Sequence, residues 1–242
     1  MTEDALSFGA AAAAYDAHRP TYPPEALAWA LGTAPRRVVD LGAGTGIMTR
    51  VLLGLGHEVL PVEPDERMRT QLADATPGVA PLDGSGESIP LPDASVDAVV
   101  CGQSYHWFDR ARAHPEIARV LRPGGVLAPV WNLRDDDVPW IAEFTRIAHG
   151  PSSRGYLGTE TIDSFGELFT PPELRIFRHV IPMTTDQLLA LVTTRSYYLV
   201  APPQRQQATV GAIRELVADL PQPFDVPYLT KTYRAYTIRG IT

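Results

Sequence analysis

The strongest constraint on the fold is an alternation, between Arg36 and Asn132, of short β-branched runs with helix-length amphipathic segments. Continuous apolar runs predict buried strands, whereas apolar residues at one-turn spacing predict helices. Strands are expected over 38–41, 58–63, 79–82, 96–101 and 126–131, and helices over 45–55, 65–75 and 109–121. Strands that alternate with helices form a parallel sheet covered on both faces, which predicts a doubly wound α/β protein.

The chain after residue 132 is less regular. A helix is expected over 139–149, a strand over 175–181, and helices over 185–194 and 208–220. A last strand over 228–238 is expected to pair antiparallel at the edge of the sheet. We therefore predict one domain of 242 residues with a seven-stranded, mostly parallel, Rossmann-like sheet. In such sheets ligands bind beyond the carboxyl ends of the strands.

Charge and cysteine content exclude several classes of protein. The formal net charge is −7, which argues against nucleic acid as a partner because a phosphate backbone requires a basic surface. The single cysteine, Cys101, falls in a predicted buried strand, where an inert thiol is expected, and this usage suits a reducing cytoplasm. Because apolar runs stay well short of 18 residues, no membrane-spanning segment is expected.

A glycine-rich loop joins the first predicted strand to the first helix. Gly42, Gly44 and Gly46 allow a tight turn and a close approach of the backbone to a ligand. An ordinary tight turn between strand and helix is the alternative. Dinucleotide-binding loops carry G-x-G-x-x-G, which would require glycine where Ile47 stands, and no Walker lysine follows. The loop is therefore better suited to a nucleoside with a short charged tail than to a pyrophosphate.

An acidic residue, Glu63, ends the second predicted strand. A carboxylate at this position can accept two hydrogen bonds from a ribose diol. The alternative is a solvated acid before Pro64 and Asp65 at the start of the next helix. Together with the glycine loop, the position favours ribose binding.

Four ordered segments resemble the motifs of the class I S-adenosylmethionine (SAM)-dependent methyltransferases. They are VVDLGAGTG over 38–46, VEP over 62–64, GSGESIPLPD over 84–93 with VDAV over 96–99, and RVLRPGG over 119–125. Two further segments, YDAHRPTYP over 15–23 and QSYHWF over 103–108, are similar to the small-molecule branch around trans-aconitate methyltransferase.

The resemblance implies a set of cofactor-binding residues. The glycine loop, with the aspartate before it, is expected to hold the amino-acid end of SAM, Glu63 its ribose, Gly86 and Glu87 its adenine, and Gln103 its methionine part. The loop residues concerned are Asp40, Gly42, Ala43, Gly44, Thr45 and Gly46. An N-terminal lid over 1–30, containing Tyr15, Arg19 and Tyr22, and a substrate-cap insertion over 134–172 are also implied.

The residues of the acceptor site are less constrained. His106 is the candidate general base, and local hydrogen bonding or packing of this side chain is the alternative. Tyr22, Tyr105 and Trp107 are candidate walls of the acceptor pocket, with core packing as the alternative for the last two. Arg19 could bind an acceptor carboxylate, although a role in fastening the lid is preferred. The six histidines are scattered, so no metal site is predicted.

The predicted function is transfer of the methyl group of SAM to a small-molecule acceptor, with a carboxylic acid oxygen as the leading acceptor atom. A natural-product hydroxyl or amine is the alternative acceptor. The alternative from another class is a SAM-binding protein that does not transfer a methyl group.

Overall fold

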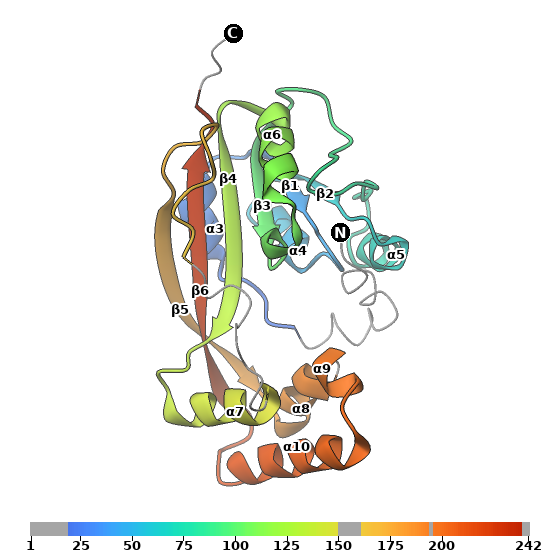
Figure 1. Ribbon diagram of the computed structural model, residues 1–242, viewed down its shortest axis with the longest axis vertical. Coiled ribbons are helices and arrows are strands. Elements are labelled where there is room, and N and C mark those ends of the chain that lie inside the picture. The colour runs from blue at the N-terminus through green and yellow to red at the C-terminus, as the bar shows by residue number, and fades with distance from the viewer. Residues whose placement is uncertain (1–18, 150–160, 194–195, 239–242) are drawn as a thin grey trace.

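The computed structural model describes residues 19–149, 161–193 and 196–238 (Figure 1). Its centre is a six-stranded sheet with the order β2-β1-β3-β4-β6-β5. The strands are β1 (Arg37–Leu41), β2 (Glu58–Val62), β3 (Val96–Gly102), β4 (Leu121–Arg134), β5 (Glu173–Met183) and β6 (Phe224–Tyr236). Strands β1 to β4 are parallel, and β6 runs antiparallel to both β4 and β5. The predicted α/β fold with a mostly parallel sheet is confirmed.

The sheet differs from the prediction in two respects. The seventh strand, predicted over 79–82, is a single bridge between Val62 and Leu82. Pro81 has no N–H group to donate and Gly78 is left-handed (φ +90°), so the segment cannot continue a ladder. The antiparallel pairing lies at the predicted end of the sheet, but β6 is second from the edge and β5 is outermost.

Helices cover both faces of the sheet because alternate strand residues point to opposite sides. On one face α3 (Pro24–Leu31) and α4 (Ile47–Gly54) pack against residues such as Val38 and Val100. On the other face α6 (Arg110–Val120) packs against residues such as Val39 and Val99. The remaining helix of this half, α5 (Glu66–Ala75), follows β2.

Two residues have the roles that the sequence predicts for them. Asp109 is the N-cap of α6, as predicted, since its carboxylate accepts from the Ala111 N–H group. Cys101 is fully buried, and burial raises the pKa of its thiol well above the ordinary value. A buried, protonated thiol is the inert form that the sequence predicts.

A second group of helices lies beyond the end of the sheet at which β4 terminates (Figure 1). It consists of α7 (Pro139–His149), α8 (Thr185–Thr193), α9 (Ser196–Leu199) and α10 (Pro203–Leu216). Their buried side chains form a separate apolar cluster that includes Phe144, Leu188 and Ile213. We call α7 to α10 the helical lobe. Only α7 falls in the insertion predicted over 134–172, and residues 150–160 lie outside the described residues.

The predicted N-terminal lid divides into two parts. Residues 1–18, which include Tyr15, lie outside the described residues. Residues 24–31 form α3, in which Ala26 and Leu27 are fully buried against the sheet. Of the described lid residues, Arg19, Pro20 and Tyr22 line the site described below.

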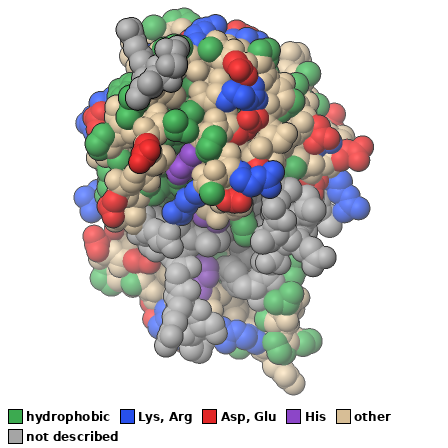
Figure 2. Space-filling model, turned by 45° about the horizontal axis from the view of Figure 1, so that its top comes forward, with side chains coloured by type: hydrophobic (Ala, Val, Ile, Leu, Met, Phe, Trp, Pro, Cys, Tyr) green, Lys and Arg blue, Asp and Glu red, His purple; other side chains and the backbone are tan. Residues whose placement is uncertain are grey.

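Charged side chains of both signs lie on the surface. Lys and Arg side chains are scattered among Asp and Glu side chains on the face shown in Figure 2. Among the described residues, no helix is long and apolar enough to cross a lipid bilayer.

Candidate cofactor site

The loop between β1 and α4 is a backbone platform at the carboxyl edge of the sheet. The N–H groups of Gly42 and Ala43 donate to the Val62 carbonyl at 2.8 and 3.1 Å, so the loop is fastened to β2. Gly44 has a φ of +56°, and a Cβ there would have only the Met68 sulfur within 4 Å, at 3.8 Å. The left-handed conformation favours glycine, and the space beside it allows a ligand to lie against the backbone.

Glu63 follows β2 and binds the backbone of the glycine loop. Its carboxylate is 7% exposed and accepts from the N–H groups of Gly44 (Oε2, 2.8 Å) and Asp65 (Oε1, 3.0 Å). These bonds use one lone pair on each oxygen, so each oxygen retains a second acceptor position. Burial raises the pKa of Glu63, while the two backbone donors oppose this shift.

Asp40 lies under the same loop at the end of β1. Its side chain is fully buried, and Oδ2 accepts from the Thr49 hydroxyl at 2.6 Å. Oδ1 has no hydrogen-bond partner among the described residues. Burial, reinforced by the nearby charge of Glu63, raises the pKa of Asp40 to about 7. An orphaned carboxylate oxygen next to the loop is suited to a cationic ligand group.

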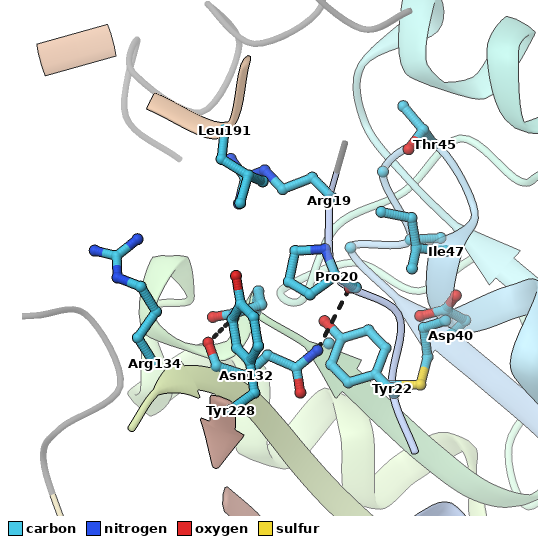
Figure 3. A pocket seen from close by; sticks show the side chains of 16 residues that line it. Arg19, Pro20, Tyr22, Asp40, Thr45, Ile47, Asn132, Arg134, Leu191 and Tyr228 are labelled. Carbon is cyan, nitrogen blue, oxygen red and sulfur yellow. Dashed lines mark hydrogen bonds between the residues drawn. The ribbon is translucent and has the colours of Figure 1, made fainter. Parts of the chain in front are cut away.

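A cavity lies between this loop and the helical lobe (Figure 3). It brings together seven of the predicted cofactor residues and the predicted wall residue Tyr22. The seven are Arg19, Asp40, Gly42, Ala43, Gly44, Thr45 and Gln103. Gly46, Glu63, Gly86 and Glu87 are not among its lining residues.

The segment predicted to pass beside the adenine is fastened to the start of α6. A Cβ on Gly86 would lie 2.7 Å from the Phe108 ring, so only glycine fits there. The Glu87 carboxylate accepts from the Asp109 N–H group at 2.9 Å, which helps to lower the pKa of Glu87 against the opposing effect of burial. The segment thus has a fixed course, and adenine contact by Gly86 and Glu87 stays a prediction.

The three ring-bearing residues after β3 differ in burial. Tyr105 is 1% exposed in the core, and its hydroxyl is 2.7 Å from His114 Nε2. His106 and Trp107 are partly exposed in a 3₁₀ turn (Tyr105–Trp107), with ring centroids 4.7 Å apart. None of the three lines the cavity. Of the two interpretations of Tyr105, core packing is the one that its surroundings match.

Eight cavity residues were not predicted as site residues, and four of them lie after the glycine-loop half of the sheet: Asn132, Arg134, Leu191 and Tyr228. Asn132 and Arg134 end β4, so the rule that ligands bind beyond strand carboxyl ends could have indicated them. Leu191 in α8 and Tyr228 in β6 carry no local signal of a binding role. The described residues contain no group of three His, Cys, Asp or Glu side chains arranged to hold a metal ion.

The fold and this cavity define a class of protein: an α/β domain that holds a nucleoside cofactor at the carboxyl edge of a parallel sheet. Comparisons with known proteins specify the family. A methyltransferase domain model matches residues 39–128. An uncharacterized methyltransferase of Mycobacterium tuberculosis is 42% identical over 241 residues, covering 95% of each chain. The chain therefore belongs to the class I SAM-dependent methyltransferases, and SAM is its cofactor.

Two further similarities are more limited. A malonyl-[acyl-carrier protein] O-methyltransferase of Methylococcus capsulatus is 39% identical over 134 residues, 51% of this chain and 49% of that one. The crystal structure of a protein from an antibiotic biosynthesis pathway of Anabaena variabilis has a TM-score of 0.63 at 20% identity, over 89% of this chain and 96% of that one. The second similarity concerns the fold alone.

The residues present fit this cofactor on three observations. Gly44 leaves room beside the loop backbone, Glu63 keeps acceptor positions of the kind that ribose hydroxyls need, and Asp40 offers an orphaned oxygen to a cationic group. SAM carries two cationic groups, its ammonium and its sulfonium. The chain is an enzyme of methyl transfer.

Proposed function

We propose that this methyltransferase acts on a small molecule that carries a carboxylate, and that a carboxylate oxygen takes the methyl group to form a methyl ester. The observation that carries the proposal is the presence of two arginines, Arg19 and Arg134, in the wall of the cavity that contains the glycine loop. Figure 3 labels both side chains around the same space. A guanidinium group recognises a carboxylate with two parallel hydrogen bonds.

Arg134 is held in a fixed position. It is 7% exposed, its Nε donates to the Thr145 hydroxyl at 3.1 Å, and its Nη2 lies 2.9 Å from His149 Nε2. Its guanidinium carbon is 4.8 Å from the centroid of the Phe144 ring. Because arginine can only donate, His149 accepts with an unprotonated nitrogen. These contacts orient the guanidinium group.

Charge also argues against an amine as the acceptor. The acidic residue among the described lining residues, Asp40, lies at the glycine loop. An ammonium ion on the arginine side of this cavity would face two guanidinium groups and the cofactor, which supplies a methyl group on a positively charged sulfur when bound. A carboxylate is attracted by all three. It is ionised at neutral pH, so the protein needs only to align it and exclude water. No histidine is among the described residues that line the cavity, which suits a reaction without a base.

One relative supports the same acceptor atom. The Methylococcus capsulatus protein is an O-methyltransferase of a malonyl group, which carries a carboxylate. For this chain we propose a small acid, because the cavity lies between the glycine loop and Leu191 of the helical lobe.

The first experiment distinguishes the acceptor atom. The protein is incubated with methyl-labelled SAM and matched sets of small dicarboxylic acids, their amides, phenols and amines. Methyl esters release labelled methanol in mild alkali, whereas ethers and N-methyl products do not. We expect alkali-labile label with acids alone. Alkali-stable label on a phenol or amine would favour the alternative acceptor.

The second experiment concerns Arg134 and His106. Arg134→Gln is expected to raise the KM for the acid 10-fold or more while the SAM affinity stays within twofold, and Arg134→Lys to recover part of the loss. His106→Ala is expected to leave acid methylation unchanged from pH 6 to 8. A loss of turnover in His106→Ala that follows pH would assign a base to the reaction and contradict a carboxylate acceptor.

A further inference from the structure

We propose that Asn132 is a positioning residue for methyl transfer, which fastens the chain at residues 20–21 and the Gln103 side chain around the cofactor cavity. The proposal rests on the contacts of Asn132 and holds for any acceptor. Asn132 lies near the end of β4 and lines the cavity. It is the only asparagine in the 242-residue sequence.

The side chain of Asn132 joins two distant segments of the chain. It is 6% exposed, and its Oδ1 accepts from the Thr230 hydroxyl of β6 at 2.6 Å. Its Nδ2 donates to the carbonyls of Thr21 (2.9 Å) and Pro20 (3.4 Å) (Figure 3). The backbone carbonyl of Asn132 accepts from Gln103 Nε2 at 2.7 Å. One residue therefore connects three segments that border the cavity.

The orientation of the amide follows from its partners. Two carbonyl groups on one side require the NH₂ end of the amide, and the Thr230 hydroxyl then donates to the opposite oxygen. Thr230 is fully buried, and its hydroxyl oxygen also lies 3.4 Å from His179 Nδ1. Thr230 thus acts through Asn132 and not on the cavity directly.

The fastened chain forms part of the cavity wall. Arg19, Pro20 and Tyr22 line it on either side of the Thr21 carbonyl. The Tyr22 hydroxyl packs against the end of β3, since a Cβ on Gly102 would lie 2.9 Å from it. If the Asn132 contact were lost, this wall would lose its buried attachment to β4.

Asn132 also holds Gln103, whose backbone conformation is unusual. Its φ is +59°, a left-handed conformation that a residue with a side chain rarely adopts. The bond from its side chain to the Asn132 carbonyl holds Gln103 in this conformation beside the glycine loop. Such conformations persist when the surroundings fix them, and they cluster at ligand sites. Asn132 therefore supports two parts of the cofactor cavity at once.

The test compares three variants by isothermal titration with SAM. Asn132→Asp keeps the acceptor for Thr230 but sets a carboxylate against two carbonyls, and we expect the Kd for SAM to rise 10- to 100-fold. Thr230→Val removes the orienting donor, and we expect a 3- to 10-fold rise. The matched control is Thr232→Val. Thr232 is also fully buried on β6, and its hydroxyl has no partner among the described residues. We expect its Kd within twofold of the parent.

A spectroscopic measurement separates positioning from general stability. Labelling with asparagine that carries ¹⁵N in its side-chain amide yields one NH₂ signal, because the sequence contains one asparagine. We expect this signal to shift on saturation with SAM, to shift in Thr230→Val without SAM, and to stay in place in Thr232→Val. If Asn132→Asp does not fold, the Thr230 variant and this signal decide. The proposal would be overturned if the SAM affinity were unchanged in Thr230→Val and the Asn132 signal did not shift on saturation with SAM.

Discussion

Asp40 and Glu63 are two buried carboxyl groups that the cofactor loop places close together, and each has a raised pKa. Their chemistry differs because their partners differ. Glu63 receives two backbone N–H groups, whereas Asp40 receives one hydroxyl and keeps an orphaned oxygen. At the scale of single residues, the site therefore contains one carboxylate that shapes the loop and one that retains an open position for a cation.

Asp40 makes the stability of the protein depend on pH. Burial raises the pKa of Asp40 from its ordinary value of 3.8 to about 7, so between pH 4 and 7 the folded state binds more protons than the unfolded state. Its contribution to the free energy of unfolding therefore falls as the pH rises through this range. We expect the free energy of unfolding of Asp40→Asn to rise by on the order of 2–4 kcal/mol relative to that of the parent as the pH goes from 4 to 7. Urea unfolding of both proteins across this range checks it, and a pH-independent difference would contradict it.

Glu63 should affect SAM binding more than stability. In Glu63→Ala the loop loses the carboxylate that accepts from Gly44, and the cofactor loses a ribose acceptor. We expect SAM affinity to fall by about 1–3 kcal/mol, the value of hydrogen bonds to a charged group. The matched control is Glu58→Ala at the opposite end of β2, where an exposed ion pair with Arg37 contributes about 1 kcal/mol or less. Equal SAM affinities in the two variants, measured by titration calorimetry, would exclude the ribose role.

At the scale of elements, the helices that begin at the carboxyl edge of the sheet start on polar caps or on a glycine. Helix α4 begins after left-handed Gly46, α5 after Asp65, and α6 after Asp109. The caps fix where each helix begins, and the loops before the helices carry the cofactor residues. A helix start is thus a structural requirement that also sets the geometry of the site.

The cap of α5 provides a prediction at this scale. The Asp65 carboxylate accepts from the N–H groups of Arg67 and Met68 at 2.8 and 3.1 Å. We expect Asp65→Ala to cost about 1 kcal/mol in the free energy of unfolding. SAM affinity should change little, because Glu63 binds the backbone N–H group of Asp65, which remains. Asp74→Ala in the last turn of α5 is the control, and we expect it to be neutral or slightly stabilising. Denaturant titration compares the two.

At the scale of the whole molecule, two apolar cores on the faces of the sheet are joined to a third core in the helical lobe. The lobe is continuous with the sheet through β5 and β6, which pair along eleven positions from Glu173 to Met183. The cavity lies where the lobe meets the glycine loop. The lobe contributes Leu191 to the cavity wall, while the sheet and its loops contribute the residues proposed to bind the cofactor and, with Arg134, the acceptor.

Phe144 tests this division of the molecule. It is fully buried in the core of the lobe, so Phe144→Ala should cost about 3–5 kcal/mol. We expect hydrogen exchange to accelerate in α7, α8 and α10 while β1 and α4 remain protected. SAM affinity should fall less than acceptor turnover, because Phe144 packs against Arg134. Val200→Ala, at a position 83% exposed, is the control. Equal loss of protection in β1 would mean that the lobe and the sheet open as one unit.

The sequence by itself determined the features that depend on neighbouring residues. Periodicity predicted the strands and helices, and the spacing of Gly42, Gly44 and Gly46 predicted the cofactor loop, because a positive φ and a close approach are local requirements. The strand predicted over 79–82 was wrong because a strand exists only where its backbone groups find a ladder, and Pro81 limits that segment to one bridge.

The tertiary structure alone decided which distant residues line the cavity. Arg134, Leu191 and Tyr228 meet Arg19 in one cavity although the chain between them spans more than two hundred residues. Tyr105 and Arg134 are both buried, yet packing against different elements assigns the first to the core and the second to the cavity wall. Such convergence depends on how the lobe packs against the sheet, which is a property of long-range contacts and leaves no period or spacing in the sequence.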